Sequence, residues 1–399
     1  MGKYLKIGLS LLLSAIVVCM GACKEGEAEE PHTHIYRVTI TKKATCLELG
    51  EKKNTCACGD TYTREIKALG HNYVNGVCSR CQDVFVPREV LKYERIDDSY
   101  YQVTGDMLGE ETDVVIPETY QGLPVKSIAW GAFSGSQLLL SVEIPATIET
   151  IGEEAFDGCK NLKRITVAED NAYYKDIDGN LYNKSGTVLL QYANGKTDES
   201  FTISKELTVK DYAFRGCVHL KAIEVAEDHA EYSSIDGNLY SKDEKELLQY
   251  AVGKTDTTFT IPNHVEEICE GAFMYCNGLE TVVMPNSVKT IDFRAFLACK
   301  NLTNVQIGEN VTHIGGEAFY NCGKLRSIVI PASVTRIQSA VFGYNVMESV
   351  VFMDTTTWTV KSVQFQDTQE ILAADLEDPK KAAGYFKTDT YYFYDWTKN

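Results

Sequence analysis

The chain has 399 residues, of which 44% are apolar and 10% aromatic, and it carries a formal charge of −17. This apolar content is enough to build large buried cores, so the composition argues against a mostly disordered chain. With 39 Lys and Arg against 56 Asp and Glu, the charge balance also argues against nucleic acid as a partner, because affinity for phosphates comes from basic side chains.

The amino terminus has the pattern of an export signal. Lys3 and Lys6 precede an apolar run over residues 7–18. That run has the length of a signal-peptide core and is shorter than a membrane span requires. We therefore expect the chain to be exported.

The end of this run suggests a lipid anchor. Met-Gly-Ala-Cys at residues 20–23 resembles the bacterial lipobox. The resemblance implies that residues 1–22 are a lipoprotein signal peptide and that Cys23 is acylated as the mature first residue. An ordinary signal peptide cut near Ala22 is the alternative. The polar residues 23–33 are then expected to be a flexible spacer.

Cysteines and histidines concentrate in the next segment, residues 34–86. Two close cysteine pairs there have a spacing that can direct sulfur atoms to one tetrahedral zinc ion. With Cys56-x-Cys58-Gly59, Leu69-Gly70-His71 and Cys78-x-x-Cys81, the segment also resembles a small zinc-ribbon-like module found ahead of repeats in exported proteins of anaerobic bacteria. Disulfides are the alternative outside the cytoplasm. In both cases the role is structural, because a segment with few apolar anchors needs a staple. The candidate zinc ligands are Cys56, Cys58, Cys78 and Cys81, with Cys46 and His71 as further candidates.

A 23-residue period dominates the body of the chain. An Ala-Phe pair, once Val-Phe, recurs within a constant apolar frame, and a unit this short cannot enclose its own apolar face. Neighbouring units must stack and bury that face between them, which describes a solenoid. The phenylalanines are Phe133, Phe156, Phe214, Phe273, Phe296, Phe319 and Phe342.

The frame closely resembles the repeat of the BspA-like subfamily of bacterial leucine-rich repeat proteins. It is seen in Ile144-Pro145, in Ala155-Phe156-x-x-Cys159 and in the Leu-x-x-Ile-x-Val of residues 162–167. The resemblance covers about residues 90–352 and implies one short parallel strand per turn, together forming a concave sheet. We assign residues 87–352 to this solenoid.

Two longer gaps, of 58 and 59 residues, separate Phe156 from Phe214 and Phe214 from Phe273. They contain two copies of one inserted element, at about residues 168–200 and 226–259. Both copies contain Asp-Gly followed by alternating apolar residues, which is typical of a turn and strand. We expect a β-hairpin in each.

Five cysteines recur three residues after the repeat phenylalanine, so stacking should place them in one interior column. A free cysteine packs as a small apolar residue, and we predict reduced thiols rather than catalysis. They are Cys159, Cys217, Cys276, Cys299 and Cys322.

The repeats end at Phe352, and residues 353–399 are expected to cap the last turn with a helix-like stretch over residues 378–386 and an aromatic terminus. The predicted fold is therefore mainly β: a leucine-rich repeat solenoid with two β-hairpin insertions, a small Cys-rich module before it and a cap after it.

No motif for catalysis is found in the sequence. It has no G-x-S-x-G, P-loop, Rossmann or H-E-x-x-H pattern. Acidic pairs such as Glu153-Glu154 occupy polar frame positions and are expected to form a solvated face. We predict no enzymatic activity, and a glycan-active enzyme is the least favoured reading.

A solenoid instead offers surface for binding. Residues that flank the inward position of each strand should face the open side, and in the last four repeats they carry no charge. We predict that they form a strip for an extended protein or glycan ligand. The alternative is an ordinary solvent-facing sheet whose β-branched residues suit strands. The strip consists of Thr281, Val283, Asn304, Gln306, Ser327, Val329, Ser349 and Val351.

Together these features predict an exported, lipid-anchored repeat protein at the bacterial cell surface or in the periplasm. The family resemblance suggests adhesion or recognition of host and matrix proteins. The alternative is a structural module of an envelope assembly. We expect a monomer, with structural zinc as the one cofactor to consider.

Overall fold

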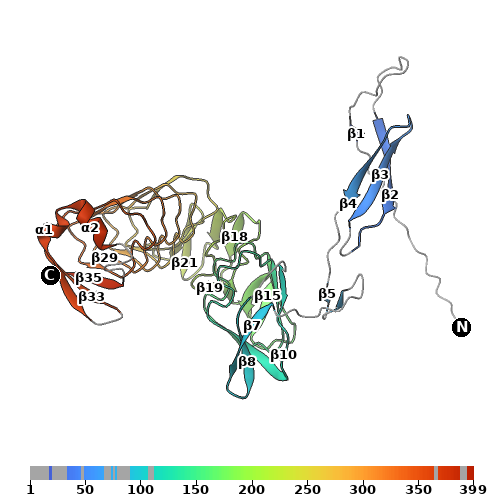
Figure 1. Ribbon diagram of the computed structural model, residues 1–399, viewed down its shortest axis with the longest axis horizontal. Helices are drawn as coiled ribbons and strands as arrows, with labels where there is room; N and C mark the ends of the chain where they lie inside the picture. The colour runs from blue at the N-terminus through green and yellow to red at the C-terminus, as the bar shows by residue number, and fades with distance from the viewer. Residues whose placement is uncertain are drawn as a thin grey trace, which may run out of the picture. The chain divides into compact units, whose positions relative to one another are not determined.

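The computed structural model describes residues 18–19, 34–45, 49–66, 73–74, 77–78, 90–106, 112–363, 367–386 and 393–399. The chain divides into two compact units, residues 1–88 and 89–399 (Figure 1). Both are built from β-strands, and within the described ranges two short helices are the only helical segments.

The described part of the first unit is an antiparallel sheet and a small hairpin. The sheet has the order β1 (Val18–Cys19), β2 (His34–Lys42), β3 (Gly50–Cys56) and β4 (Thr61–Ile66), and the hairpin pairs β5 (Tyr73–Val74) with β6 (Val77–Cys78). Among its described residues only Tyr36, Gly50, Asn54 and Cys56 are buried. A core this small is consistent with a module that needs a covalent or metal staple.

The second unit begins with an antiparallel hairpin of β7 (Leu91–Ile96) and β8 (Tyr100–Asp106). β9 (Asp113–Val115), β10 (Thr119–Tyr120) and β11 (Leu123–Ile128) follow. Because β11 runs parallel to β8 and to β13 (Thr150–Ile151) of the next repeat, the hairpin starts the same stack of strands. The rings of Tyr93 and Tyr120 stack 3.9 Å apart against this end of the core.

Each repeat contributes to two walls. The strand wall holds the Leu-x-x-Ile-x-Ile segments, and the phenylalanine wall holds short strands followed by the Ala-Phe pairs. The strand wall consists of β9, β12 (Ser141–Ile144), β14 (Arg164–Val167), β18 (Ser200–Ile203), β20 (Ala222–Val225), β24 (Thr258–Thr260), β26 (Thr281–Val283), β28 (Asn304–Gln306), β30 (Ser327–Ile330) and β32 (Ser349–Phe352). The strands of the phenylalanine wall are β13, β19 (Thr208–Val209), β25 (Glu267–Ile268), β27 (Thr290–Ile291), β29 (His313–Ile314) and β31 (Arg336–Ile337). Parallel pairing within both walls stacks about 11 turns, which confirms the predicted solenoid (Figure 1).

Stacked phenylalanine rings run through the core beneath the phenylalanine wall. The ring centroids of Phe273 and Phe296 lie 4.6 Å apart, and those of Phe296 and Phe319 lie 5.2 Å apart. Between these repeats the backbone is also joined, since the Phe273 amide donates to the Ala295 carbonyl at 2.8 Å. Each turn thus buries its apolar face only against its neighbours, as the 23-residue period predicts.

The repeat cysteines form the expected interior column of free thiols. Cys299 donates a hydrogen bond to the Phe273 carbonyl at 3.1 Å. In the last repeat Asn345 replaces the cysteine and donates to the Phe319 carbonyl at 2.8 Å in the same way. Burial raises the pKa of the Cys159 thiol to about 12, so it stays protonated and inert.

Both inserts contain the expected hairpin and one strand more. The first comprises β15 (Tyr174–Ile177), β16 (Asn180–Asn183) and β17 (Val188–Gln191), and the second β21 (Tyr232–Ile235), β22 (Asn238–Ser241) and β23 (Glu246–Gln249). The hairpin turn needs left-handed backbone, which Asp178 and Gly179 adopt with φ of 51° and 76°.

The third strand makes each insert a full turn of the solenoid. β17 pairs in parallel with β19, and β23 pairs with β25. Tyr192 then takes the place of a repeat phenylalanine, and its amide donates to the Ala213 carbonyl at 3.0 Å. Tyr250 does the same toward Ala272 at 2.8 Å. The inserts therefore extend the core as well as projecting hairpins from it.

The chain after the last repeat closes the core. β33 (Trp358–Ser362), β34 (Thr368–Ile371) and β35 (Tyr394–Lys398) add antiparallel strands beyond β31. Two helices, α1 (Ala373–Leu376) and α2 (Pro379–Tyr385), lie between them, and Asp378 caps α2 by accepting the Lys380 amide at 2.9 Å. Phe386 packs edge-on to Phe342 at 5.2 Å and stacks on Trp396 at 4.6 Å.

Candidate functional site

The eight residues of the strip lie on four strands of the strand wall, β26, β28, β30 and β32. The residues between them, such as Val282 and Ile328, are buried in the core, so the strip residues on either side point outward. Parallel register aligns the outward residues of β26 with those of β28, and those of β30 with those of β32. The paired residues are Thr281 with Asn304, Val283 with Gln306, Ser327 with Ser349, and Val329 with Val351.

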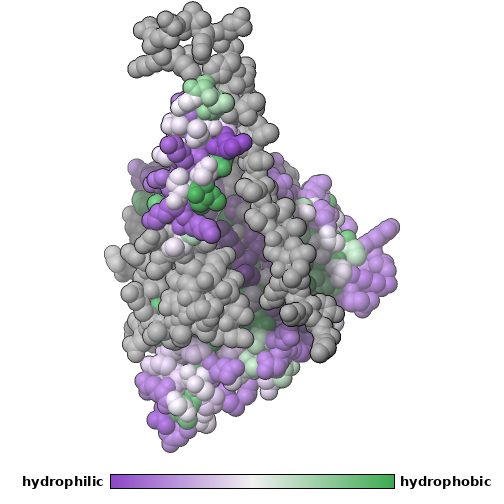
Figure 2. All heavy atoms as spheres, turned by 90° about the vertical axis from the view of Figure 1, so that its right-hand side faces the viewer, coloured by the Kyte–Doolittle hydropathy of each residue, from purple (hydrophilic) through white to green (hydrophobic). Residues whose placement is uncertain are grey.

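The strip carries no charge, whereas three earlier strands of the same wall do. The equivalent outward positions of β12, β14 and β20 carry Glu143, Arg164 and Glu224. On the face in Figure 2, hydrophilic side chains predominate among the coloured residues. Val329, by contrast, is 47% exposed within the strip. Uncharged hydroxyl and amide groups beside the exposed Val329 and the half-buried Val283 and Val351 can pair with a ligand without first displacing the hydration shell of a charge.

A second group of polar side chains lies on the phenylalanine wall. Glu154 accepts hydrogen bonds from Arg294 Nη1 at 3.1 Å and Arg215 Nη1 at 3.5 Å. Arg215 also lies 3.3 Å from Glu270, and Arg294 donates to Glu317 at 2.6 Å. Glu154 and Arg294 are 140 residues apart in sequence, so this cluster joins repeats on both sides of the two inserts. We call these five side chains the seam cluster.

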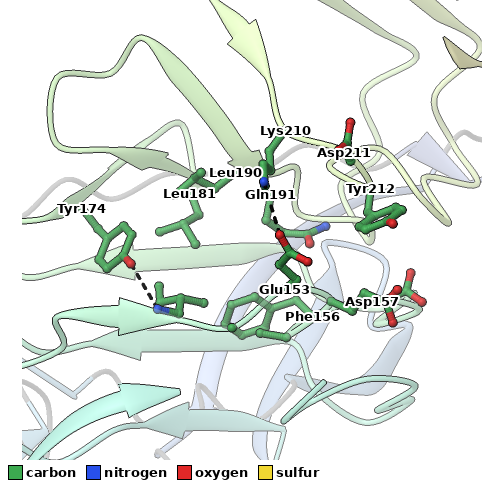
Figure 3. Close-up of a pocket in the computed structure, with 14 residues that line it drawn as sticks. Glu153, Phe156, Asp157, Tyr174, Leu181, Leu190, Gln191, Lys210, Asp211 and Tyr212 are labelled. Atoms are coloured by element: carbon green, nitrogen blue, oxygen red, sulfur yellow. Dashed lines mark hydrogen bonds and ion pairs between the residues drawn. The ribbon is translucent and has the colours of Figure 1, made fainter. Parts of the chain in front are cut away.

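A cavity of about 140 Å³ opens beside the seam cluster, between the repeat of Phe156 and the first insert (Figure 3). Its apolar lining is Ile151, Ala155, Phe156, Leu181 and Leu190, and its polar lining includes Glu153, Asp157, Gln191, Lys210, Asp211 and Tyr212. Lys210 forms an ion pair with Glu153 at 3.3 Å. Burial raises the pKa of Asp157 to about 6, although Arg215 and Arg294 favour its ionised form.

A family model for the BspA type leucine-rich repeat region matches six copies, over residues 112–188 and 250–371. The chain carries BspA-type leucine-rich repeats. Both the strip and the walls of the cavity lie largely on these repeats. The matched residues stop near β17 and resume at Tyr250, and the structure places the second insert and the repeat of Phe214 in that interval.

Solved structures with such repeats are similar to this chain. A leucine-rich cell surface protein from Faecalibacterium prausnitzii is 23% identical, with 67% of this chain and 88% of that chain covered and a TM-score of 0.38. The pneumococcal vaccine antigen PcpA is 19% identical over 67% and 81%, with a TM-score of 0.40. A leucine-rich repeat protein from Eubacterium ventriosum is 20% identical over 65% and 94%, with a TM-score of 0.27. No curated protein matches the sequence.

The candidate zinc ligands are described only in part. Cys56 is buried at the end of β3, and Cys58 is exposed within the turn that follows, in which the Gly59 amide donates to the Cys56 carbonyl at 3.0 Å. For Cys78 the structure describes the backbone of β6 alone. Cys46, His71, Cys81 and the lipidation residue Cys23 lie outside the described residues. Among the side chains that are described, no three His, Cys, Asp or Glu converge as metal ligands would.

The seam cluster corrects one expectation from the sequence. Glu153 is exposed as expected, but the side chain of its neighbour Glu154 is only 10% exposed and is held by two arginines. The residue that could have indicated a buried acidic partner is Arg215, which directly follows Phe214. The other repeats of BspA type carry no basic residue at that position. A basic residue next to a buried phenylalanine implies a buried counter-charge.

Proposed function

We propose that this protein is an exported, lipid-anchored binding protein that holds an extended protein or glycan along the strip. The observation that carries the proposal is the strip itself, two pairs of parallel strands that present neutral side chains outward, aligned within each pair. BspA-type leucine-rich repeat proteins are typically surface or binding proteins, which supports the same function. Adhesion to a host or matrix protein is the specific role we propose.

Anchoring in this proposal is through the lipid on Cys23. Within the described residues no helix is long and apolar enough to cross a membrane. The segment of residues 34–86 would then be a stapled spacer between the membrane and the solenoid. Its staple is a structural zinc ion bound by two cysteine pairs, which leaves no open coordination position for catalysis.

Zinc content and free thiols test the staple. We expect about one zinc ion per purified mature chain, because two close cysteine pairs supply four ligands. The solenoid should contribute six titratable thiols after denaturation, since Cys269 and the five column cysteines are free. Mass spectrometry of the native protein and a thiol titration measure both. A metal-free protein with disulfides among residues 46–81 would contradict the zinc staple.

Introducing positive charge into the strip tests the binding function. The variant with Val283, Val329 and Val351 each changed to Lys should lose partner capture at least about tenfold, because three ammonium groups would have to be desolvated in the interface. The full chain is used as bait for host extracellular matrix and, separately, for the bacterium's own envelope. Capture from matrix supports adhesion, whereas capture from the envelope alone favours the structural role.

A matched control carries the same added charge elsewhere. Thr150, Thr312 and Thr335 are exposed threonines associated with the phenylalanine wall, and their replacement by Lys should leave capture unchanged. Circular dichroism checks that both variants fold. Equal capture by the strip variant and the wild type would refute the proposed binding surface.

A further inference from the structure

A buried histidine, His229, holds the start of the second hairpin. Its side chain is 2% exposed, and both ring nitrogens are bonded to the backbone. Nε2 lies 3.0 Å from the Leu207 carbonyl and must donate to it, because a carbonyl oxygen only accepts. Nδ1 accepts the amides of Glu231 and Tyr232, each at 3.1 Å. The imidazole in this arrangement is therefore neutral, with its one proton on Nε2.

The first strand of the second hairpin depends on this ring. β21 begins at Tyr232 and, within the described range 112–363, lies at the edge of its sheet and pairs only with β22. The Tyr232 ring stacks on the His229 ring at 4.8 Å, and its hydroxyl donates to the Val209 carbonyl at 3.4 Å. His229 and Tyr232 together join β21 to the preceding turn of the solenoid.

The first insert has the same anchor, with an amide in place of the imidazole. Asn171 stands at the equivalent position and is fully buried. Its Oδ1 accepts the amides of Tyr173 and Tyr174, each at 2.9 Å, and its Nδ2 donates to the Ile148 carbonyl at 3.0 Å. The two hairpins thus share one design but differ in a chemical property of the anchor. An imidazole titrates between pH 5 and 8, and an amide does not.

Protonation is incompatible with the hydrogen bonds that His229 makes. An imidazolium carries N–H groups on both ring nitrogens and has no acceptor. Nδ1 would then present a proton to the amide hydrogens of Glu231 and Tyr232, and both amides would lose their acceptor. Asn171 keeps its acceptor oxygen throughout the same pH range, so the first hairpin has no such sensitivity.

The charged side chains on the segments around His229 do not offer it a counter-charge. Within the described range 112–363, no carboxylate forms an ion pair with the His229 ring, and Asp228 is paired with Lys205 instead. Except for the half-buried Tyr232, the titratable and charged side chains of these segments are exposed to water. They are Glu227, Asp228, Glu231 and Tyr232 of the same turn, Lys205 and Glu206 of the loop before Leu207, Lys210 and Asp211 after β19, and Lys242 after β22.

We propose that His229 is an acid-sensitive anchor, and that protonation of its Nδ1 releases β21 from the solenoid while β15 of the first insert stays in place. The hairpin covers one edge of β20. The Ile223 amide donates to the Gly237 carbonyl at 2.8 Å, and Ser234 Oγ on β21 donates to the Ile223 carbonyl at 2.7 Å. Release of β21 would therefore uncover backbone groups of β20 that can pair with another strand.

Hydrogen exchange of the full chain at pH 7.5 and 5.0 tests the proposal, with each rate corrected for the intrinsic pH dependence of exchange. A histidine in an open chain titrates near pH 6.5. Because the closed hairpin excludes the proton and the open one binds it, the closed form loses stability as the pH falls below that value. Opening should be about thirtyfold more frequent at pH 5.0 than at pH 7.5. We expect this loss of protection at the amides of Glu231 and Tyr232, and no comparable loss at those of Tyr173 and Tyr174.

Two variants assign the effect to one side chain. His229→Asn gives the second hairpin the anchor of the first and should remove the pH dependence at Glu231 and Tyr232. His264→Asn is the matched control, since that histidine is exposed and its ring lies 6.2 Å from Tyr240 of the same hairpin. This control should keep the thirtyfold loss.

The comparison of the two hairpins within the wild type does not depend on the folding of any variant. Equal changes in protection at the two hairpins between pH 7.5 and 5.0 would overturn the proposal. The same conclusion would follow if the loss of protection at β21 persisted in His229→Asn.

Discussion

Replacing Trp396 by alanine should destabilise the protein by about 3–5 kcal/mol, the usual effect of removing a large buried aromatic side chain. Trp396 is 1% exposed, stacks on Phe386 at 4.6 Å and contacts Trp358 at a ring distance of 6.4 Å. Its strand β35 also pairs with β31 of the last repeat. Losing this residue therefore exposes the end of the core that the cap covers.

The loss should be local at first, because each turn of a solenoid is stabilised mainly by its neighbours. Relative to the wild type, the variant should show faster hydrogen exchange in β31 and β32, with little change in β12 and β14. Its first unfolding transition should also occur at a lower urea concentration. Trp130→Ala is the matched control, since that tryptophan is 67% exposed and its removal should change stability by less than about 0.5 kcal/mol. Uniformly faster exchange along the whole solenoid would contradict the capping role.

Replacing Asp157 by asparagine should stabilise the protein at pH 8 by about 3 kcal/mol. Burial raises the pKa of Asp157 from 3.8 to about 6, and each unit of pKa corresponds to about 1.36 kcal/mol. Because the folded state binds this proton more tightly than the unfolded state, wild-type stability falls as the pH rises from about 4 through 6. Asparagine has the same shape and does not ionise.

The advantage of Asp157→Asn should therefore shrink as the pH falls and vanish near pH 4, where the aspartate is protonated in both states. Urea unfolding of both proteins at pH 8, 6 and 4 measures this difference. Asp211 lines the same cavity but is exposed, so Asp211→Asn should not produce a comparable change in stability. A destabilised Asp157→Asn variant at pH 8 would mean that the ion pairs of the seam cluster require the negative charge.

The repeat architecture was predictable because its signal is periodic. A phenylalanine every 23 residues, with a cysteine three residues later, leaves stacking as the one way to bury both, and the structure has that stacking at Phe273, Phe296 and Phe319. The helix of residues 379–385 was also predictable, since Asp378 and Pro379 are typical residues for its start.

The inserts could be predicted only locally. Asp178-Gly179 indicates a tight turn, but the sequence around Tyr192 does not predict that its ring takes the place of a repeat phenylalanine. That role depends on the position of Ala213 in the next turn, 21 residues later. The contact between Glu154 and Arg294 is even harder to predict from the sequence, because 140 residues separate the two side chains and only the path of the solenoid brings them together.

The candidate sites divide in the same way. The positions of the strip residues could be predicted from the alternation of side chains along single strands, which is a local rule, and these residues lie on the outward side of β26, β28, β30 and β32. The cavity arises where an insert interrupts the wall between two repeats. Its most informative residue, Asp157, could not be distinguished by sequence from the many acidic residues on the surface.

Hydrogen exchange of the full chain with and without its captured partner tests the binding claim most directly. Our account predicts slower exchange at the amides of β26, β28, β30 and β32, with no change in β25, β27 and β29 of the opposite wall. Protection confined to the phenylalanine wall or to residues 34–86, with the strip unchanged, would contradict it.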